Sequence, residues 1–394
     1  MIGFVDDCNG QTNSFEAYCS INTVCHLIRK AQQNAQNWND ILSASGGALE
    51  LSKTSCHVVQ WIFAANGAPV LAPLNPKYKD SLRVWDSQSK RTHSLEVLSA
   101  YKAHKTLGHY KDPAGTQQEQ YRQLKKRSDE TTSFLWKCPL TRLEAWTYYY
   151  ACYLPRVSYP LSCSSLSRHQ LDVIQRQAMK IIVARCGFNR HTRKEILYGP
   201  LALGGASFRH LYVQQGIHQT MMFIRHWRQD STAGRLLRIA IAWFQEQTGV
   251  SFSIMHDVHS KLPQLESKWI KSLRQFMSSI NVRLQLDEPA IPKVQRLYDV
   301  HLMDVIQNSH QFTDAEVKRL NYCRLFLKAV TLSDISHTTG TRLDMSKLEG
   351  RPSLISSATH GPTIYQEPPS AAEWILWKRA NRLWSDVDGS LHEP

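Results

Sequence analysis

The 394-residue chain has no hydrophobic run long enough for a membrane span and no cysteine pair spaced as Cys-x-x-Cys. Its longest apolar stretch, residues 236–244, is interrupted by Arg238 and is far shorter than the roughly 20 residues that cross a bilayer. The first seven residues end in two carboxylates, unlike a secretory leader. We therefore expect an intracellular protein of the nucleus or cytoplasm, with free thiols and no membrane partner.

Extremes of composition are also absent. Hydrophobic residues make up 42% of the chain and charged residues 20%, which excludes a wholly disordered, collagen-like or coiled-coil protein. The length predicts roughly two or three domains and is sufficient for a sizeable buried core.

Positive charge is present in excess and is concentrated in the middle of the chain. Formal net charge is +14, and residues 101–230 hold 20 basic and 8 acidic residues, whereas residues 1–100 hold 8 of each. Single-sign charge at this density causes self-repulsion unless a polyanion neutralises it. The segment therefore indicates a nucleic-acid partner, although a solvated Lys-rich helix surface is an alternative.

The pattern of apolar residues predicts an α+β fold. We expect a short strand over residues 1–5, a helix over 14–43 with Trp38 on its apolar face, and a small β region over 48–110. Asn66-Gly67 lies between two β-rich runs and predicts a hairpin over 56–71. Weaker strands are expected at 82–85 and 106–110.

From residue 116 onward the pattern is helical. Thr116 with Glu119, Ser167 with Gln170, and Thr313 with Glu316 have the spacing of capping boxes. Residues 336–370 have the composition of a loop, and a final helix contains three tryptophans. The expected regions are 1–110, a basic helical 111–230 and a helical extension 231–394.

Asp6 and Asp7 follow the apolar residues Phe4 and Val5. Two adjacent carboxylates at the end of a strand repel each other unless a cation lies between them, and oxygen ligands of this kind suit Mg²⁺. Two such ions can stabilise the attacking and leaving oxygens in phosphoryl transfer. An ordinary polar turn is the alternative for an Asp-Asp pair taken alone.

Other motifs follow this pair in a fixed order: Gly46-Gly47, Leu49, Leu51, Lys53-Thr54, the 56–71 hairpin, Thr106 to Tyr110, and Gln175 to Lys180. Together with the Phe-Val-Asp-Asp motif, this order resembles the late palm and thumb of a reverse transcriptase from a retrotransposon without long terminal repeats. The resemblance covers roughly residues 1–230, with 231–394 as a helical continuation.

The resemblance implies RNA-templated DNA synthesis on an RNA template and DNA primer duplex. Asp6, with Asp7 beside it, matches the metal-binding aspartate, which takes Mg²⁺ or Mn²⁺, and Lys53 matches a lysine that assists pyrophosphate departure. The family requires a further metal-binding aspartate and nucleotide-binding fingers upstream of this motif. Because nothing precedes residue 1, we expect a truncated palm that is inactive alone.

The basic segment then corresponds to a thumb that contacts the duplex backbone. The candidate phosphate-binding residues are Lys125, Lys126, Arg127, Arg176, Lys180, Arg185, Arg190, Arg193 and Lys194. Tyr148 to Tyr150 are suited either to base stacking or to an aromatic core, and we favour the core.

Two other functions stay open on sequence grounds. One is a non-catalytic nucleic-acid-binding helical protein, and the other is a structural helical protein whose Asp-Asp pair is accidental. His256, Asp257 and His259 have the residue types of zinc ligands but lie in one loop without a second pair, so we expect no zinc.

Overall fold

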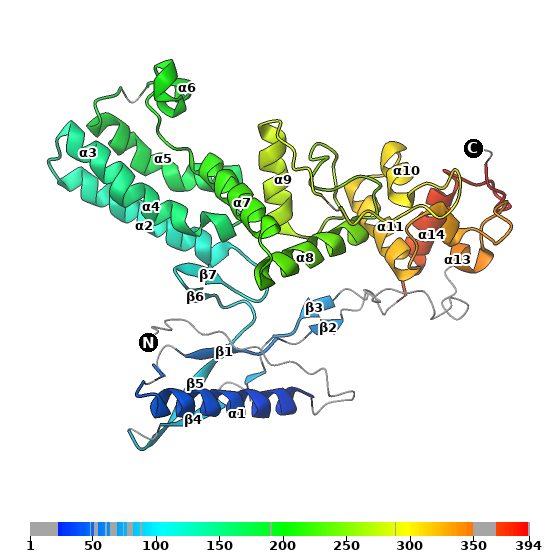
Figure 1. The fold of residues 1–394 in the computed structure, drawn as a ribbon, viewed down its shortest axis with the longest axis horizontal. Coiled ribbons are helices and arrows are strands. Elements are labelled where there is room, and N and C mark those ends of the chain that lie inside the picture. Colours follow the sequence, from blue (N-terminus) through cyan, green and yellow to red (C-terminus); the bar gives the residue numbers. More distant parts are fainter. Residues whose placement is uncertain are drawn as a thin grey trace. The chain divides into compact units, whose positions relative to one another are not determined.

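The computed structural model describes residues 23–47, 49–50, 54–59, 61–63, 69–73, 75–76, 82–86, 89–189, 191–287, 289–349 and 368–392. Its described part is α+β, as the sequence predicts: one helix and a set of short strands precede a long series of helices (Figure 1). The chain divides into two compact units, Met1–Arg127 and Ser128–Pro394. Each is described by itself below. The expected strand over 1–5 and the Asn66-Gly67 turn lie outside the described residues.

In its described residues the first unit contains the long helix α1 (Thr23–Ala44), the first half of a second helix and seven short strands. The strands are β1 (Ser55–His57), β2 (Trp61–Phe63), β3 (Pro69–Leu71), β4 (Leu82–Asp86), β5 (Arg91–Leu98), β6 (His104–Thr106) and β7 (His109–Lys111). One sheet has the order β1-β5-β4, with β1 parallel and β4 antiparallel to β5. The pairs β2–β3 and β6–β7 are antiparallel.

Helix α1 packs on this sheet through apolar side chains and through glutamine side chains. Ile28 belongs to the same buried apolar cluster as Leu82 and Val84 of the sheet. One turn apart, Gln32 and Gln36 bond the backbone of β4, the edge strand: Trp85 N donates to Gln36 Oε1 (2.8 Å), and Gln36 Nε2 donates to Trp85 O (3.0 Å). Amide side chains therefore take the place of a neighbouring strand at an edge that otherwise has unpaired backbone groups.

Four details of this unit differ from the sequence prediction. The predicted 56–63 strand is two strands, because β1 pairs with β5 while β2 pairs with β3. Strand β5 was not predicted. Leu107 and Gly108 form the turn between β6 and β7, with φ values of 47° and 80°, rather than a strand. Trp38 is 39% exposed, and its neighbour Asn39 is the buried residue.

Helix α2 (Gln118–Lys137) contains the boundary between the two units, and helices make up most of the second. They are α3 (Arg142–Tyr148), α4 (Leu154–Ser158), α5 (Arg168–Arg185), α6 (Lys194–Tyr198), α7 (Leu211–Arg228), α8 (Thr232–Thr248), α9 (Lys268–Ser279), α10 (Leu302–Asn308), α11 (Asp314–Phe326), α12 (Leu332–Ile335), α13 (Met345–Glu349) and α14 (Ala371–Asn381). A π-helical turn, Tyr149–Tyr153, joins α3 to α4.

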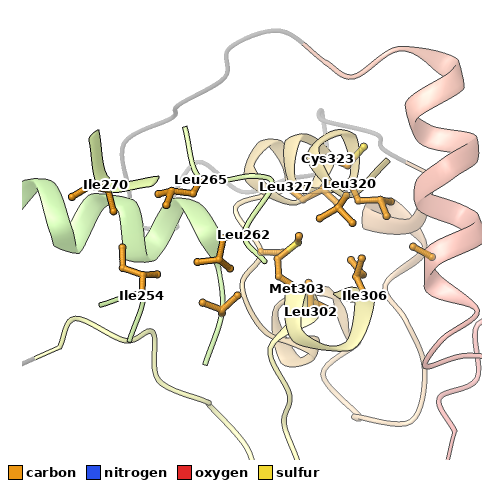
Figure 2. Packing of buried hydrophobic residues seen from close by; sticks show 14 of the residues in the cluster. Ile254, Leu262, Leu265, Ile270, Leu302, Met303, Ile306, Leu320, Cys323 and Leu327 are labelled. Carbon is orange, nitrogen blue, oxygen red and sulfur yellow. The ribbon is translucent and has the colours of Figure 1, made fainter. Parts of the chain in front are cut away.

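The largest apolar core of the second unit lies among its C-terminal helices. Figure 2 shows Leu302, Met303 and Ile306 of α10 facing Leu320 and Cys323 of α11. The final helix α14 contributes Trp377, which is fully buried in this core. Trp384, after the helix, also belongs to the core and is 5% exposed. The predicted terminal helix is therefore confirmed for Trp374 and Trp377, whereas Trp384 lies three residues beyond its end.

Two of the three predicted capping boxes are confirmed. Ser167 begins α5 and Thr313 begins α11, each with reciprocal side-chain to backbone bonds. The prediction at Thr116 is wrong, because the hydroxyl of Thr116 donates to Asp112 Oδ2 (2.6 Å) and α2 begins at Gln118. The Thr116 hydroxyl therefore bonds to Asp112, which precedes it in the chain, and does not cap the helix.

Candidate nucleic-acid interface

Helix α5 presents two basic side chains on its exposed face. Leu171, Ile174 and Ala178 bury the opposite face at helical spacing. Arg176 and Lys180 are exposed and lie four residues apart, so they are neighbours on the helix surface. Within the described part of the chain neither side chain makes an ion pair or a hydrogen bond. These two cations are therefore available to an external anion.

A second group of charges surrounds His210, which caps the start of α7. Its Nδ1 accepts from Tyr212 N (3.2 Å), so its Nε2 is the atom that faces Asp172 Oδ1 of α5, at 2.9 Å. Burial lowers the pKa of His210; the carboxylate of Asp172 opposes this shift, and the positive charges of Arg168 and Lys194 add to it. Helices α5 and α6 thus bring two further cations close to one imidazole.

Arg193 and Lys194 occupy the start of α6. Arg193 is the N-cap residue, with extended backbone (φ −57°, ψ 143°), and Lys194 is the first helical residue. Both side chains are exposed. The positive charge of Lys194 acts weakly on His210, which is paired with Asp172 of α5.

Arg185 does not share the face of Arg176 and Lys180. It lies nine residues after Arg176, about two and a half helical turns, and therefore on the opposite side of α5. Its side chain is half-buried and donates to the carbonyl of Trp136 at 3.4 Å. Arg185 therefore contacts the end of α2 and does not belong to the exposed basic face of α5.

The three predicted residues of α2 belong to the first unit. Lys125 and Lys126 are exposed, and Arg127 is half-buried. Asp129 and Glu130 follow the two lysines at a spacing of four, although Glu130 pairs with Arg156 (2.5 Å). Charges of both signs therefore occur on α2, as they do on α5, where Asp172 precedes Arg176 by four residues but pairs with His210.

The remaining predicted site residues, Asp6, Asp7, Lys53 and Arg190, lie outside the described residues. Among the residues that are described, no three His, Cys, Asp or Glu side chains gather as a metal site. The Mg²⁺ or Mn²⁺ site thus stays a prediction.

Of the three tyrosines that we expected in an aromatic core, Tyr149 lies in one, whereas Tyr148 is half-buried and Tyr150 is 38% exposed. Tyr149 is fully buried, and Trp146 stacks on Phe208 with ring centroids 4.7 Å apart. The Tyr149 hydroxyl accepts from Arg209 N (2.7 Å), and burial raises its pKa. This core fixes the segment that leads into α7.

Sequence reasoning missed the positioning role of Gln175, which is 3% exposed. Its Nε2 donates to Arg209 O (3.0 Å) and its Oε1 accepts from Leu211 N (2.9 Å). A glutamine in line with the buried face of a helix is a signal for such a role, because a buried amide needs hydrogen-bond partners.

No protein-family model, curated protein or solved structure matches the chain.

Proposed function

We propose that the exposed surface of α5 and α6 binds the phosphate backbone of a nucleic-acid duplex. The observation that carries this proposal is the exposed pair Arg176 and Lys180, which has no acidic partner in the described chain, with Arg168 and Lys194 near His210. Lysine and arginine contacts to phosphates position a protein on a duplex without reading its sequence.

The distribution of charge indicates a polyanion as the partner. The excess of positive charge lies within residues 101–230, which include α5 and α6. None of the helices in the described ranges has the length and apolar character needed to cross a bilayer.

The fuller form of the proposal is that the chain is the C-terminal part of a retroelement reverse transcriptase. The helices of the second unit would then act as its thumb on an RNA–DNA template–primer, and Asp6 and Asp7 would hold Mg²⁺ or Mn²⁺ in the palm. The ordered motifs from Phe4 to Lys180 support this form.

Salt dependence of duplex binding tests the backbone contact. Each phosphate contact contributes a slope of about −0.9 to log K against log salt on B-DNA. Arg176→Ala/Lys180→Ala should flatten the slope by about 1.8 if both side chains contact phosphates, and should weaken binding equally on unrelated sequences.

Helix α14 offers a matched control. Lys378 and Arg382 are also exposed, four residues apart, and without an ion pair in the described chain. Lys378→Ala/Arg382→Ala removes the same charge from the same unit and should leave the slope unchanged. Equal effects of the two double variants would indicate a diffuse charge effect, and a flat slope for the natural chain would contradict the proposal and favour a structural role.

Primer extension tests the polymerase form. In a polypeptide that joins this chain to upstream fingers and palm, Asp6→Ala should abolish Mg²⁺-dependent extension on an RNA template, because two-metal transfer loses a ligand. Extension that survives this change would exclude Asp6 as the metal ligand.

A further inference from the structure

The segment between α6 and α7 is a closed loop with a rigid base. Four backbone bonds join its two sides: Ala206 N to Ile196 O (2.7 Å), Ser207 N to Gly199 O (2.8 Å), Phe208 N to Leu197 O (2.9 Å) and Gly205 N to Pro200 O (3.0 Å). The Ser207 hydroxyl also accepts from Leu201 N (3.0 Å). The loop therefore holds one conformation by its own hydrogen bonds.

Glycine permits the close approach of the two sides. A Cβ at Gly205 would lie 2.2 Å from Gly199 O, and one at Gly199 would lie 2.5 Å from Glu195 O. Real side chains do not tolerate such distances, so the loop requires glycine at both positions.

The base and tip of the loop differ in environment. Phe208 at the base is 2% exposed and stacks on Trp146. Leu201 and Leu203 at the tip are 73% and 84% exposed. A flexible loop could fold two leucines onto the protein, whereas this one holds them in solvent.

Basic residues flank this apolar tip. Residues 199–208 contain no charged side chain. Arg193, Lys194 and Glu195 precede the loop and Arg209 follows it, all four exposed, so the flanks carry a net positive charge. Proteins that kink a duplex use this combination: leucine or another apolar side chain enters between base pairs, and cations hold the adjacent phosphates.

We propose that Leu201 and Leu203 form a wedge that enters a base step of the bound duplex and unstacks it. This inference rests on the proposed function and adds a mode of binding to it. The basic flanks also suit an anionic membrane surface, but membrane-surface proteins usually bury the apolar face of a whole helix. One inserted side chain is enough to open a base step, so two leucines favour the duplex.

A duplex with 2-aminopurine at an internal step tests the wedge, since this base fluoresces more when unstacked. With the natural full chain at saturation, fluorescence should rise above that of the free duplex. Leu201→Ala/Leu203→Ala should abolish the rise and leave the salt slope unchanged. Affinity should fall by less than about tenfold, because the cost of unstacking offsets most of the contact energy.

Leu297 provides a matched control, since it is 84% exposed, as is Leu203. Leu297→Ala should leave the fluorescence rise intact. Arg176→Ala/Lys180→Ala should flatten the salt slope but retain the rise at saturating protein.

The outcomes separate the two proposals. Salt-dependent binding of the natural chain without a fluorescence rise would overturn the wedge and leave the proposed function standing. Absence of duplex binding would overturn both. Loss of binding to phosphatidylserine vesicles in Leu201→Ala/Leu203→Ala, with the fluorescence rise unaffected, would identify a membrane-contacting tip and overturn the wedge.

Discussion

Arginine is used in two opposite ways in the second unit. Arg176 is exposed on α5 and has no partner in the described chain, whereas Arg324 of α11 is 1% exposed. The Arg324 guanidinium donates to Glu246 O and Gln247 O at 2.9 Å, to Ala329 O at 3.0 Å and to Asn321 Oδ1 at 3.0 Å. Two of these carbonyls lie in the last turn of α8, where the helix dipole is negative.

Arg274 repeats the buried arrangement. It is 5% exposed and donates to the carbonyls of Asp257 and Ser260 at 2.7 Å, and also to that of Ile254. Burial lowers its pKa to about 10, and the charge of Asp257 opposes this shift. Net charge therefore overstates the cations that a polyanion can reach, and the contrast with α5 identifies those that can bind phosphate.

The largest expected effect follows removal of a buried guanidinium. Arg324→Met leaves several carbonyls without donors in the core, so we expect a loss of about 3–5 kcal/mol in the free energy of unfolding. Urea unfolding measures it. Arg319→Met, at an exposed position of the same helix, should change stability by less than about 0.5 kcal/mol. Similar losses in the two variants would contradict the structural role of Arg324.

Gly205→Ala tests the rigid base of the loop between α6 and α7. Its Cβ would clash with Gly199 O, so we expect a loss of about 2–3 kcal/mol in thermal or urea unfolding. Gly204→Ala is the matched control: it meets nothing within 4 Å, but the φ of +76° is left-handed. It should cost only about 1 kcal/mol. The reverse order would mean that backbone conformation, not close approach, requires these glycines.

A buried histidine in the first unit gives the expected pH dependence. Burial lowers the pKa of His109 to about 4, compared with about 6.5 in an unfolded chain. As pH falls below 6.5 the unfolded state binds the proton first, so stability falls between pH 6.5 and 4. At pH 5 this amounts to about 2 kcal/mol relative to pH 7. In His109→Gln, urea unfolding at pH 7 and pH 5 should no longer show this difference of about 2 kcal/mol. If the difference is unchanged, another group causes the pH dependence.

Removal of an amide from α1 has a smaller expected effect. Gln36→Ala deletes two hydrogen bonds to the backbone of Trp85 at the edge of the sheet, which contribute about 1 kcal/mol at a partly exposed site. Gln33→Ala changes an exposed glutamine of the same helix and should be neutral, as alanine is a good helix former. Hydrogen exchange at Trp85 N reports the local effect, and equal exchange in both variants would contradict it.

Local rules predicted part of this structure. Ser167 with Gln170 gave the start of α5, and its apolar spacing gave the buried face, because capping and periodicity depend on neighbours in sequence. The amide contact of Gln36 to β4 and the burial of Arg324 were not predictable in this way. Each depends on backbone groups supplied by a distant segment, and an isolated glutamine or arginine in the sequence is typical of a helix surface.

The candidate interface shows the same limit. Periodicity places Arg176 and Lys180 on one face and Arg185 on the other, and this was available from spacing alone. Neither the approach of Lys194 to His210 nor the exposed tip at Leu201 and Leu203 was available, because both depend on how the α6–α7 segment folds back on itself.

The smallest expected change in stability is that of Arg176→Ala/Lys180→Ala. Both side chains are exposed and make no ion pair within the described chain, so unfolding should change by less than about 0.5 kcal/mol, with a slight gain if the two like charges repel. Urea unfolding beside the duplex titration provides the comparison with Arg324. If these two cations serve phosphate, duplex binding weakens while stability is kept. A loss of stability comparable to that of Arg324→Met would mean that α5 uses its cations as α11 does, for structure, and the proposed interface would lose its main support.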